Sequence, residues 1–222
     1  MIFSQDSHAS RPLVTEDAGI VGAGACQLEA WTEHDRNDVS VTWLNPACNF
    51  FENTEIALGV AHERSEGERN TLTRWHVKHV FKELDENSAG YGLIVYSERD
   101  RRIHRHLLGD TGLTGIVSFP LMGEALIAHT NLGVARTNNS DTWKNRGVWA
   151  GALDWEFLPA TRLSAETFGI SGSRANWQLG IRHELVPRRM QVDASIGSPF
   201  GRWSGDRVAS IGVIFFTPAF LR

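Results

Sequence analysis

A long hydrophobic run is missing from the sequence. No stretch approaches the ~20 consecutive apolar residues that a transmembrane helix needs. Hydrophobic residues make up 41% of the 222 residues, as in many water-soluble proteins. This absence leaves room for a membrane protein built from strands, because a barrel strand needs only ~9–11 residues with every second one apolar.

Charge of a single sign is also missing. The formal net charge is -4, both signs are spread along the chain, and no basic patch carries interleaved aromatic residues. We therefore expect no nucleic-acid surface. The one locally basic run, residues 99–106, is interpreted as a solvated loop. Its alternative is a contact with the phosphates of lipopolysaccharide at a membrane surface.

The N-terminus does not have the pattern of a signal peptide. Residues 1–6, Met-Ile-Phe-Ser-Gln-Asp, provide neither the basic region nor the long apolar region of such a signal. An exported barrel requires one, so we expect that the signal was removed by processing or that the start was trimmed.

Signatures of enzymes and metal sites are scarce as well. There is no Gly-x-Ser-x-Gly elbow and no phosphate-binding glycine-rich loop. His76 and His79 are three positions apart, so a regular strand places them on opposite faces. His104 and His106 can share a face but have no evident third ligand. We predict no enzyme, no cofactor and no metal; the alternative is a lipid-modifying or proteolytic barrel with a site built from distant residues.

Period-two alternation is the strongest positive signal. In residues 148–157, Trp149, Leu153 and Trp155 share one face, whereas Asp154 lies on the other. Such alternation puts one face in an apolar medium and the other in a polar one. The same pattern recurs in residues 176–185, 190–197 and 208–215.

Strand-like segments recur along the chain, and short turns marked by proline or glycine alternate with longer polar loops. The predicted strands cover residues 21–34, 38–45, 53–64, 70–82, 89–99, 111–119, 124–136, 146–157, 161–170, 174–186, 188–197 and 206–217. The predicted short turns lie at residues 45–46, 120–123, 158–160 and 186–188, and the longer loops at 64–70, 98–111, 136–145 and 198–206. The pattern predicts an all-β fold: a single antiparallel up-and-down transmembrane β-barrel of about twelve strands over residues 21–222, after an N-terminal periplasmic segment at residues 1–20.

A soluble β-sandwich or lipocalin-like binder would alternate too, with its polar face toward water. The positions of the aromatic residues favour the barrel, because most fall near predicted strand ends, where aromatic girdles lie at the lipid headgroups. These residues are Trp43, Trp75, Phe81, Phe119, Trp149, Trp155, Phe157 and Trp177.

Five short motifs occur in order along most of the chain: residues 11–17 (RPLVTED), 45–49 (NPACN), 129–133 (HTNLG), 165–169 (AETFG) and 185–187 (LVP). Together they resemble the proteobacterial outer-membrane family named "MetA-pathway of phenol degradation". The resemblance implies a barrel in the outer membrane of Gram-negative bacteria and a link to the transport of aromatic compounds. The terminal strand, with Phe215, Phe216 and Phe220, resembles the signal that barrel-assembly machinery recognises.

Cys26 and Cys48 are the only cysteines, and they lie eleven residues on either side of Asn37. A hairpin centred there brings them face to face. We predict a disulfide, as the periplasm and cell surface favour; two free thiols are the alternative.

That hairpin register also pairs Glu29 with Asn45 and Trp31 with Trp43. It conflicts with an inside–outside assignment that puts Glu29 and Trp43 on opposite faces. We therefore expect a bulge or register shift in this hairpin.

The predicted inward face carries both charge signs, which can pair across a narrow lumen. The lumen-lining candidates are Glu29, Glu55, Arg74, His76, Lys78, His129, Asn131, Arg146, Asp154, Glu156, Arg162, Glu166, Gln178, Arg182, Glu184 and Asp193. They predict a monomeric, porin-like narrow pore or transporter for small, hydrophobic or aromatic molecules, in contact with outer-membrane lipid and lipopolysaccharide. The alternative is a structural or interaction barrel with a closed lumen.

Overall fold

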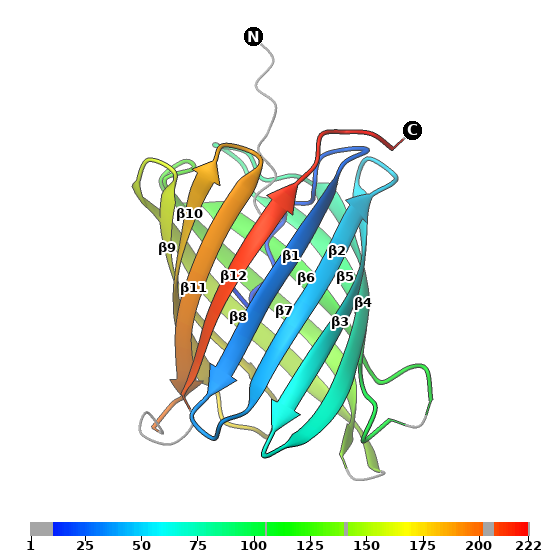
Figure 1. Cartoon of the computed structure of the whole chain (residues 1–222). Helices are drawn as coiled ribbons and strands as arrows, with labels where there is room; N and C mark the ends of the chain where they lie inside the picture. Colours follow the sequence, from blue (N-terminus) through cyan, green and yellow to red (C-terminus); the bar gives the residue numbers. More distant parts are fainter. Residues whose placement is uncertain (1–10, 105, 140–141, 202–206, 222) are drawn as a thin grey trace.

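The computed structural model describes residues 11–104, 106–139, 142–201 and 207–221, which form a closed antiparallel barrel of twelve strands (Figure 1). Each strand pairs with its neighbours in the sequence, and β12 closes the barrel against β1. The strands are β1 (Cys26–Asp35), β2 (Ser40–Asn49), β3 (Thr54–Ser65), β4 (Glu68–Lys82), β5 (Gly90–Asp100), β6 (Asp110–Pro120), β7 (Leu126–Asn139), β8 (Thr142–Leu158), β9 (Thr161–Ile170), β10 (Asn176–Val186), β11 (Met190–Pro199) and β12 (Val208–Phe216). The predicted fold class is confirmed.

Some sequence predictions fall outside the described residues. These are residues 1–10 of the predicted N-terminal segment, Arg105 of the basic run, residues 140–141 of the predicted loop 136–145, and residues 202–206 of the last predicted loop. Within the described ranges, no helix is long and apolar enough to cross a membrane.

Two predicted boundaries are wrong near the start of the chain. The first strand begins at Cys26 rather than at residue 21, and Asn45 and Pro46 lie inside β2 rather than in a turn. Proline lacks the N–H that a ladder needs, and the pairing of β2 with β3 passes from Leu44 directly to Ala47 with its register kept. Pro46 therefore leaves a gap in the ladder without ending the strand.

The two rims of the barrel differ. The rim at the top of Figure 1, here called the turn rim, carries the start of β1, the end of β12 and short connections such as residues 159–160 and 187–189. The opposite rim, here called the loop rim, carries the connection 101–109 and the long hairpin of β7 and β8.

Two connections of the loop rim are shorter than predicted. β7 extends to Asn139 and β8 begins at Thr142, so strands cover most of the expected loop at residues 136–145. The expected loop at residues 64–70 is a two-residue turn, because Glu66 (φ 47°) and Gly67 (φ 86°) both adopt the left-handed conformation of a tight hairpin.

The outer surface is apolar and the interior polar. Leu153 and Ile181 are 48% and 44% exposed, whereas Asp154 and Arg182, which directly follow them on β8 and β10, are 2% and 5% exposed. This arrangement is the inverse of a water-soluble barrel and matches the alternation in the sequence. A two-sheet sandwich is excluded, since the strands form one closed ladder.

Aromatic side chains gather on the outer surface near the turn rim. Phe81, Phe119, Trp155 and Phe157 are all exposed there, and Trp155 contacts Phe157 edge to face at 5.2 Å between centroids. Not all predicted girdle residues lie there: Trp43 points inward and is 5% exposed, and Trp75 and Trp149 lie near the middle of β4 and β8 rather than at strand ends.

The first hairpin has the simple register. Cys26 pairs with Cys48, Glu29 with Asn45 and Trp31 with Trp43, with no shift between them. The expected bulge is absent because these last four side chains all lie inside: Trp31 and Trp43 stack at 5.7 Å, and Asn45 Nδ2 donates to Glu29 Oε2 at 3.0 Å.

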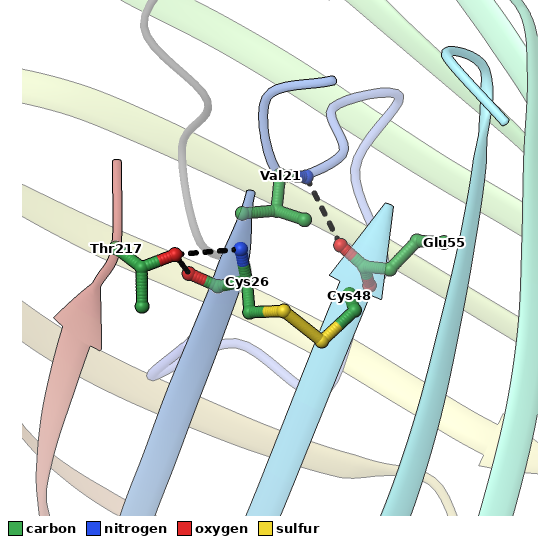
Figure 2. The surroundings of a disulfide bond; sticks show 5 residues. All are labelled: Val21, Cys26, Cys48, Glu55 and Thr217. Carbon is green, nitrogen blue, oxygen red and sulfur yellow. Dashed lines mark hydrogen bonds between the residues drawn. A yellow bond between two sulfur atoms is a disulfide. The ribbon is translucent and has the colours of Figure 1, made fainter. Parts of the chain in front are cut away.

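The predicted disulfide between Cys26 and Cys48 is present (Figure 2). It joins the first residue of β1 to the end of β2 at the turn rim. The backbone N–H of Cys26 also donates to Thr217 Oγ1 at 2.9 Å. The start of β1 is therefore bonded both to β2 and to the residue that follows β12.

Candidate functional site

The interior of the barrel holds most of the predicted lumen-lining residues. Buried ones are Glu29, Glu55, Lys78, His129, Asn131, Asp154, Arg162, Glu166, Arg182 and Asp193. Half-buried ones are Arg74, His76, Arg146, Gln178 and Glu184, whereas Glu156 is exposed. Arg146 bonds to Ser171 of the connection after β9, away from the other interior charges.

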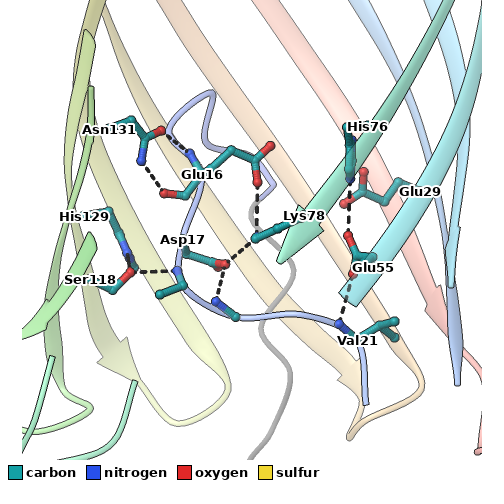
Figure 3. A network of polar contacts seen from close by, with 12 residues as sticks. Glu16, Asp17, Val21, Glu29, Glu55, His76, Lys78, Ser118, His129 and Asn131 are labelled. Atoms are coloured by element: carbon teal, nitrogen blue, oxygen red, sulfur yellow. Dashed lines mark hydrogen bonds and ion pairs between the residues drawn. The ribbon is translucent and has the colours of Figure 1, made fainter. Parts of the chain in front are cut away.

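The interior also holds a segment that precedes the first strand. Residues 11–21, here called the lumen segment, lie inside the barrel and bond to its wall on both sides (Figure 3). The described part of the predicted periplasmic segment is therefore surrounded by strands. Its contacts run round the wall in order, from β11 and β12 through β10, β9, β7 and β6 to β3 and β2.

Glu166 on β9 is the main anchor for the first part of the lumen segment. Its carboxylate accepts hydrogen bonds from Val14 N (2.9 Å), Thr15 N (2.8 Å) and Thr15 Oγ1 (2.7 Å). Gln178 Nε2 links the wall to the lumen segment, since it donates to Glu166 Oε1 at 2.9 Å and to Pro12 O at 2.6 Å. Hydrogen bonds to an ionised carboxylate are stronger than hydrogen bonds between neutral groups.

The wall makes room for this part of the segment. A Cβ atom on Gly180 of β10 would lie 2.5 Å from Pro12 Cγ and 2.6 Å from Ser164 Oγ. Only glycine therefore allows Pro12 to rest against the strand.

Lys78 and Asn131 hold the middle of the lumen segment (Figure 3). Lys78 Nζ lies 3.2 Å from Glu16 Oε2 and 3.1 Å from Asp17 Oδ1. Asn131 clamps the backbone of Glu16, because Oδ1 accepts from Glu16 N and Nδ2 donates to Glu16 O, both at 2.8 Å. Burial opposes the ionisation of Asp17, but the Lys78 ammonium and the N–H of Gly19 outweigh it, and the pKa of Asp17 lies below its ordinary 3.8.

Ser118 and His129 continue the chain of contacts. Ser118 Oγ accepts from Ala18 N at 2.8 Å and lies 2.8 Å from His129 Nδ1. Ala18 also packs with Ile94 and Ile116 in a small buried cluster. Ser118 is 0% exposed, and its hydrogen bond from Ala18 N holds the lumen segment against β6.

Glu55 and Asn49 bind the end of the lumen segment. Glu55 Oε2 accepts from Val21 N at 3.0 Å, and its other oxygen lies 3.4 Å from His76 Nε2. Asn49 Nδ2 donates to Val21 O at 2.8 Å. Gly24 N then donates to Asn49 O at 3.0 Å, which leads the chain to the turn rim beside the disulfide.

Cavities lie on both sides of the lumen segment. The larger, about 550 Å³, lies toward the loop rim, and Arg11 and Glu16 are among its lining residues. The smaller, about 100 Å³, lies toward the turn rim and is lined by Asp17, Ala18 and Asp85 among others. The lumen segment therefore separates the two cavities and contributes to the lining of both.

The larger cavity has an aromatic and cationic wall. The guanidinium of Arg74 lies 4.7 Å from the ring centroid of Trp31 and 4.6 Å from that of Trp43. Arg11 lies 4.4 Å from the Trp31 centroid. Such contacts stabilise a guanidinium by about 0.5–2 kcal/mol each. Trp31 Nε1 also donates to Glu33 Oε1 at 2.7 Å.

A second charge cluster lies beside the smaller cavity. Asp154 Oδ2 bonds to Arg162 Nε at 3.0 Å and to the guanidinium of Arg182. Arg162 Nη1 also donates to Glu124 O at 3.0 Å, in the turn after β6. This cluster ties β8, β9 and β10 together near the turn rim.

Sequence reasoning did not identify residues 11–21 as the main partner of the inward-facing wall residues. Residues 11–21 show no period-two alternation, and their only signal was a run of polar residues in one of the family-like motifs. Their place in the lumen depends on partners up to 199 positions away.

Solved structures with the same architecture include outer-membrane porins. The KdgM porin has a TM-score of 0.68 at 10% identity, over 85% of this chain and 98% of that one. The NanC porin has a TM-score of 0.66 at 9% identity, over 85% and 98%. The Acinetobacter baumannii outer membrane protein Omp33 has a TM-score of 0.55 at 8% identity, over 86% and 96%.

The chain therefore has the fold of outer-membrane porins. No curated protein matches it, and the resemblance to the "MetA-pathway of phenol degradation" family is not confirmed. A family model does match residues 1–206, and the chain belongs to that family, described as Uncharacterised conserved protein UCP029691.

Proposed function

We propose that this protein is an outer-membrane barrel that passes small solutes through a lumen normally closed by its own residues 11–21. The observation that carries the proposal is the position of this lumen segment between two cavities, bonded to strands on opposite sides of the barrel. Passage requires that the segment shift or leave.

The outer surface supports a place in a membrane. Its leucine, isoleucine and phenylalanine side chains are widely exposed, and exposed aromatics lie near the turn rim, as in the interfacial girdles of barrels. We assign the turn rim to the periplasm and the loop rim to the outside, because the two longest connections between strands, 101–109 and 200–207, lie on the loop rim. We expect Arg101, which is exposed on the loop rim, to bind phosphate groups of lipopolysaccharide.

The lining of the larger cavity favours polar solutes over purely hydrophobic ones. Glu29, Asn45 and Asn131 contribute polar groups, and Trp31 contributes an aromatic face. Oligogalacturonate, which accompanies KdgM in one structure, is a polyanion, and the carboxylates of this cavity disfavour such a ligand. A link to aromatic compounds rests on the sequence resemblance and on Trp31.

A structural barrel with a permanently closed lumen is the second candidate. It is favoured by the density of the contacts between the segment and the wall, including three hydrogen bonds from Val14 N, Thr15 N and Thr15 Oγ1 to Glu166.

Conductance across planar lipid bilayers distinguishes the two candidates. A plugged pore shows little conductance as the unmodified chain and stepwise conductance after Glu166→Gln, which weakens the anchor. Glu184→Gln is the matched control, because Glu184 also faces inward but does not contact the lumen segment in the described structure. A barrel that conducts in neither state, although its segment has been released, is structural.

A further inference from the structure

Arg11 occupies a position on the wall that has the chemistry of an organic-cation site. Its Nη2 atom lies 3.1 Å from Asp193 Oδ1 and 3.1 Å from Ser210 Oγ. Its guanidinium carbon lies 4.4 Å from the centroid of the Trp31 ring. A carboxylate, a hydroxyl and an indole face together suit a guanidinium or ammonium group.

The site is built by three neighbouring strands of the wall. Asp193 lies on β11, Ser210 on β12 and Trp31 on β1. Gly212 of β12 is paired with Asp193 on one side and with Trp31 on the other. A Cβ atom at Gly212 would lie 2.7 Å from Asp193 Oδ2, so the glycine leaves the space that the carboxylate fills.

Arg11 does not saturate this site. The side chain of Asp193 is 0% exposed, yet its Oδ2 atom has no hydrogen-bond partner in the described part of the chain. Arg11 Nε is likewise buried without a partner. A guanidinium can engage a carboxylate through two parallel bonds, and Arg11 reaches Asp193 through one nitrogen only. The backbone of the lumen segment restricts how Arg11 can be oriented. A free cation has no such restriction and can be oriented to bind both carboxylate oxygens of Asp193.

The adjoining cavities hold a surplus of negative charge. The carboxylates that line the 550 Å³ cavity are Glu16, Glu29, Glu33, Glu55 and Glu98, against Arg11, Arg74 and His76. A second cavity of about 300 Å³ also has Arg11, Glu33 and Ser210 in its lining. Confined walls with excess carboxylates concentrate cations, so a cationic solute has two approaches to the site.

We propose that Asp193, Ser210 and Trp31 form a binding site for a small guanidinium- or ammonium-bearing cation, and that Arg11 is its internal occupant, displaced when such a solute binds. Displacement frees the first described residue of the lumen segment. Cation binding and release of the segment are then coupled, because each favours the other. The binding site stands by itself, whereas the effect of release on passage rests on the proposed function.

The test uses agmatine, which carries a guanidinium and an ammonium group, with the full chain in detergent micelles and isothermal titration calorimetry. Arg11→Gln removes the internal competitor, so agmatine should bind at least about tenfold more tightly than to the unmodified protein. Adding Asp193→Asn or Trp31→Leu to Arg11→Gln should reverse that gain. Arg146→Gln is the matched control, because Arg146 lies on the loop rim and bonds to Ser171 and Ser173 instead.

Two results would overturn the inference. One is equal affinity of agmatine for the unmodified protein and for Arg11→Gln. The other is undiminished affinity in Arg11→Gln/Asp193→Asn and in Arg11→Gln/Trp31→Leu, each with an unchanged far-ultraviolet circular dichroism spectrum. Bilayer conductance measured with agmatine separates this inference from the proposed function. If Arg11→Gln binds agmatine more tightly but never conducts, the cation site is supported and the proposed passage of solutes is ruled out.

Discussion

Thr15 and Glu166 are 151 positions apart in the sequence, yet Thr15 donates both its backbone N–H and its hydroxyl to Glu166 Oε2, at 2.8 and 2.7 Å. The first residue precedes all strands, and the second lies on the far wall of a finished barrel. The contact can form only when most of the wall is in place. The lumen segment therefore binds its own barrel as a ligand would, and its release can be measured.

Weakening this anchor should expose the segment to protease. Glu166→Gln removes the charge that Val14 and Thr15 bind, which costs about 1–3 kcal/mol of docking. Endoproteinase Glu-C should then cleave after Glu16 faster than in the unmodified protein, as mass spectrometry of the N-terminal fragment would show. Glu184→Gln should leave the rate unchanged; equal acceleration by both variants would mean that the anchor is not specific.

Filling the notch at Gly180 should displace the segment without any change of charge. A Cβ there would approach Pro12 Cγ to 2.5 Å, so Gly180→Ala should raise Glu-C cleavage after Glu16. Gly151→Ala serves as the control, because its nearest contact would be an ordinary 4.0 Å from the backbone oxygen of His129. Cleavage that stays slow in Gly180→Ala would show that Pro12 does not depend on this space.

Charge on the outer face should destabilise the barrel in lipid. Leu153→Arg and Leu179→Arg should each cost ~2–4 kcal/mol where the position is near the bilayer midplane. Glu184→Arg, on the inner face, should cost less. Denaturant unfolding in lipid vesicles measures these differences, and a chain that stays monomeric and soluble without detergent would contradict membrane insertion.

The disulfide should strengthen the barrel without being needed for it. A disulfide between Cys26 and Cys48, which are 22 positions apart, contributes ~3 kcal/mol in the chain-entropy model, while twelve strands already close the ladder. Thiol labelling with mass analysis should find no free thiol before reduction, and the reduced protein should keep its β-sheet spectrum. Two labelled thiols in the unreduced protein would rule out the bond in solution.

Docking of the segment should tolerate neutral pH and weaken in acid. The pKa of Asp17 is lower in the docked state than its ordinary 3.8, so its contribution is complete above about pH 4 and is lost as pH falls through the lowered pKa. Conductance should therefore rise only below about pH 4 through this group. Asp17→Asn should remove that step, and a rise already between pH 7 and 5 that Asp17→Asn abolishes would contradict the assignment.

The wall could be predicted from the sequence because its signal is local. Leu153 and Asp154 differ in polarity as adjacent residues on a strand must when one faces lipid and the other a polar lumen. Counting outward from Asn37 likewise predicted the pairing of Cys26 with Cys48.

The contents of the lumen could not be predicted in the same way. The place of Thr15 depends on Glu166, and no periodicity in residues 11–21 marks them as an interior ligand. Trp43 was assigned to an outer girdle because it lies near a predicted strand end. In the structure β2 continues to Asn49, and Trp43 stacks on Trp31 inside.

The central claim, that residues 11–21 close a conduit, is tested most directly by single-channel recording of the unmodified protein and of Lys78→Gln/Glu166→Gln in the same planar bilayer. Lys78 and Glu166 together bind Val14, Thr15, Glu16 and Asp17. The account predicts a nearly silent unmodified protein and frequent stepwise openings in the double variant, with Glu-C cleavage after Glu16 confirming that the segment has left. Large, steady, porin-like conductance in the unmodified protein would contradict it, as would silence in the double variant once that cleavage is complete.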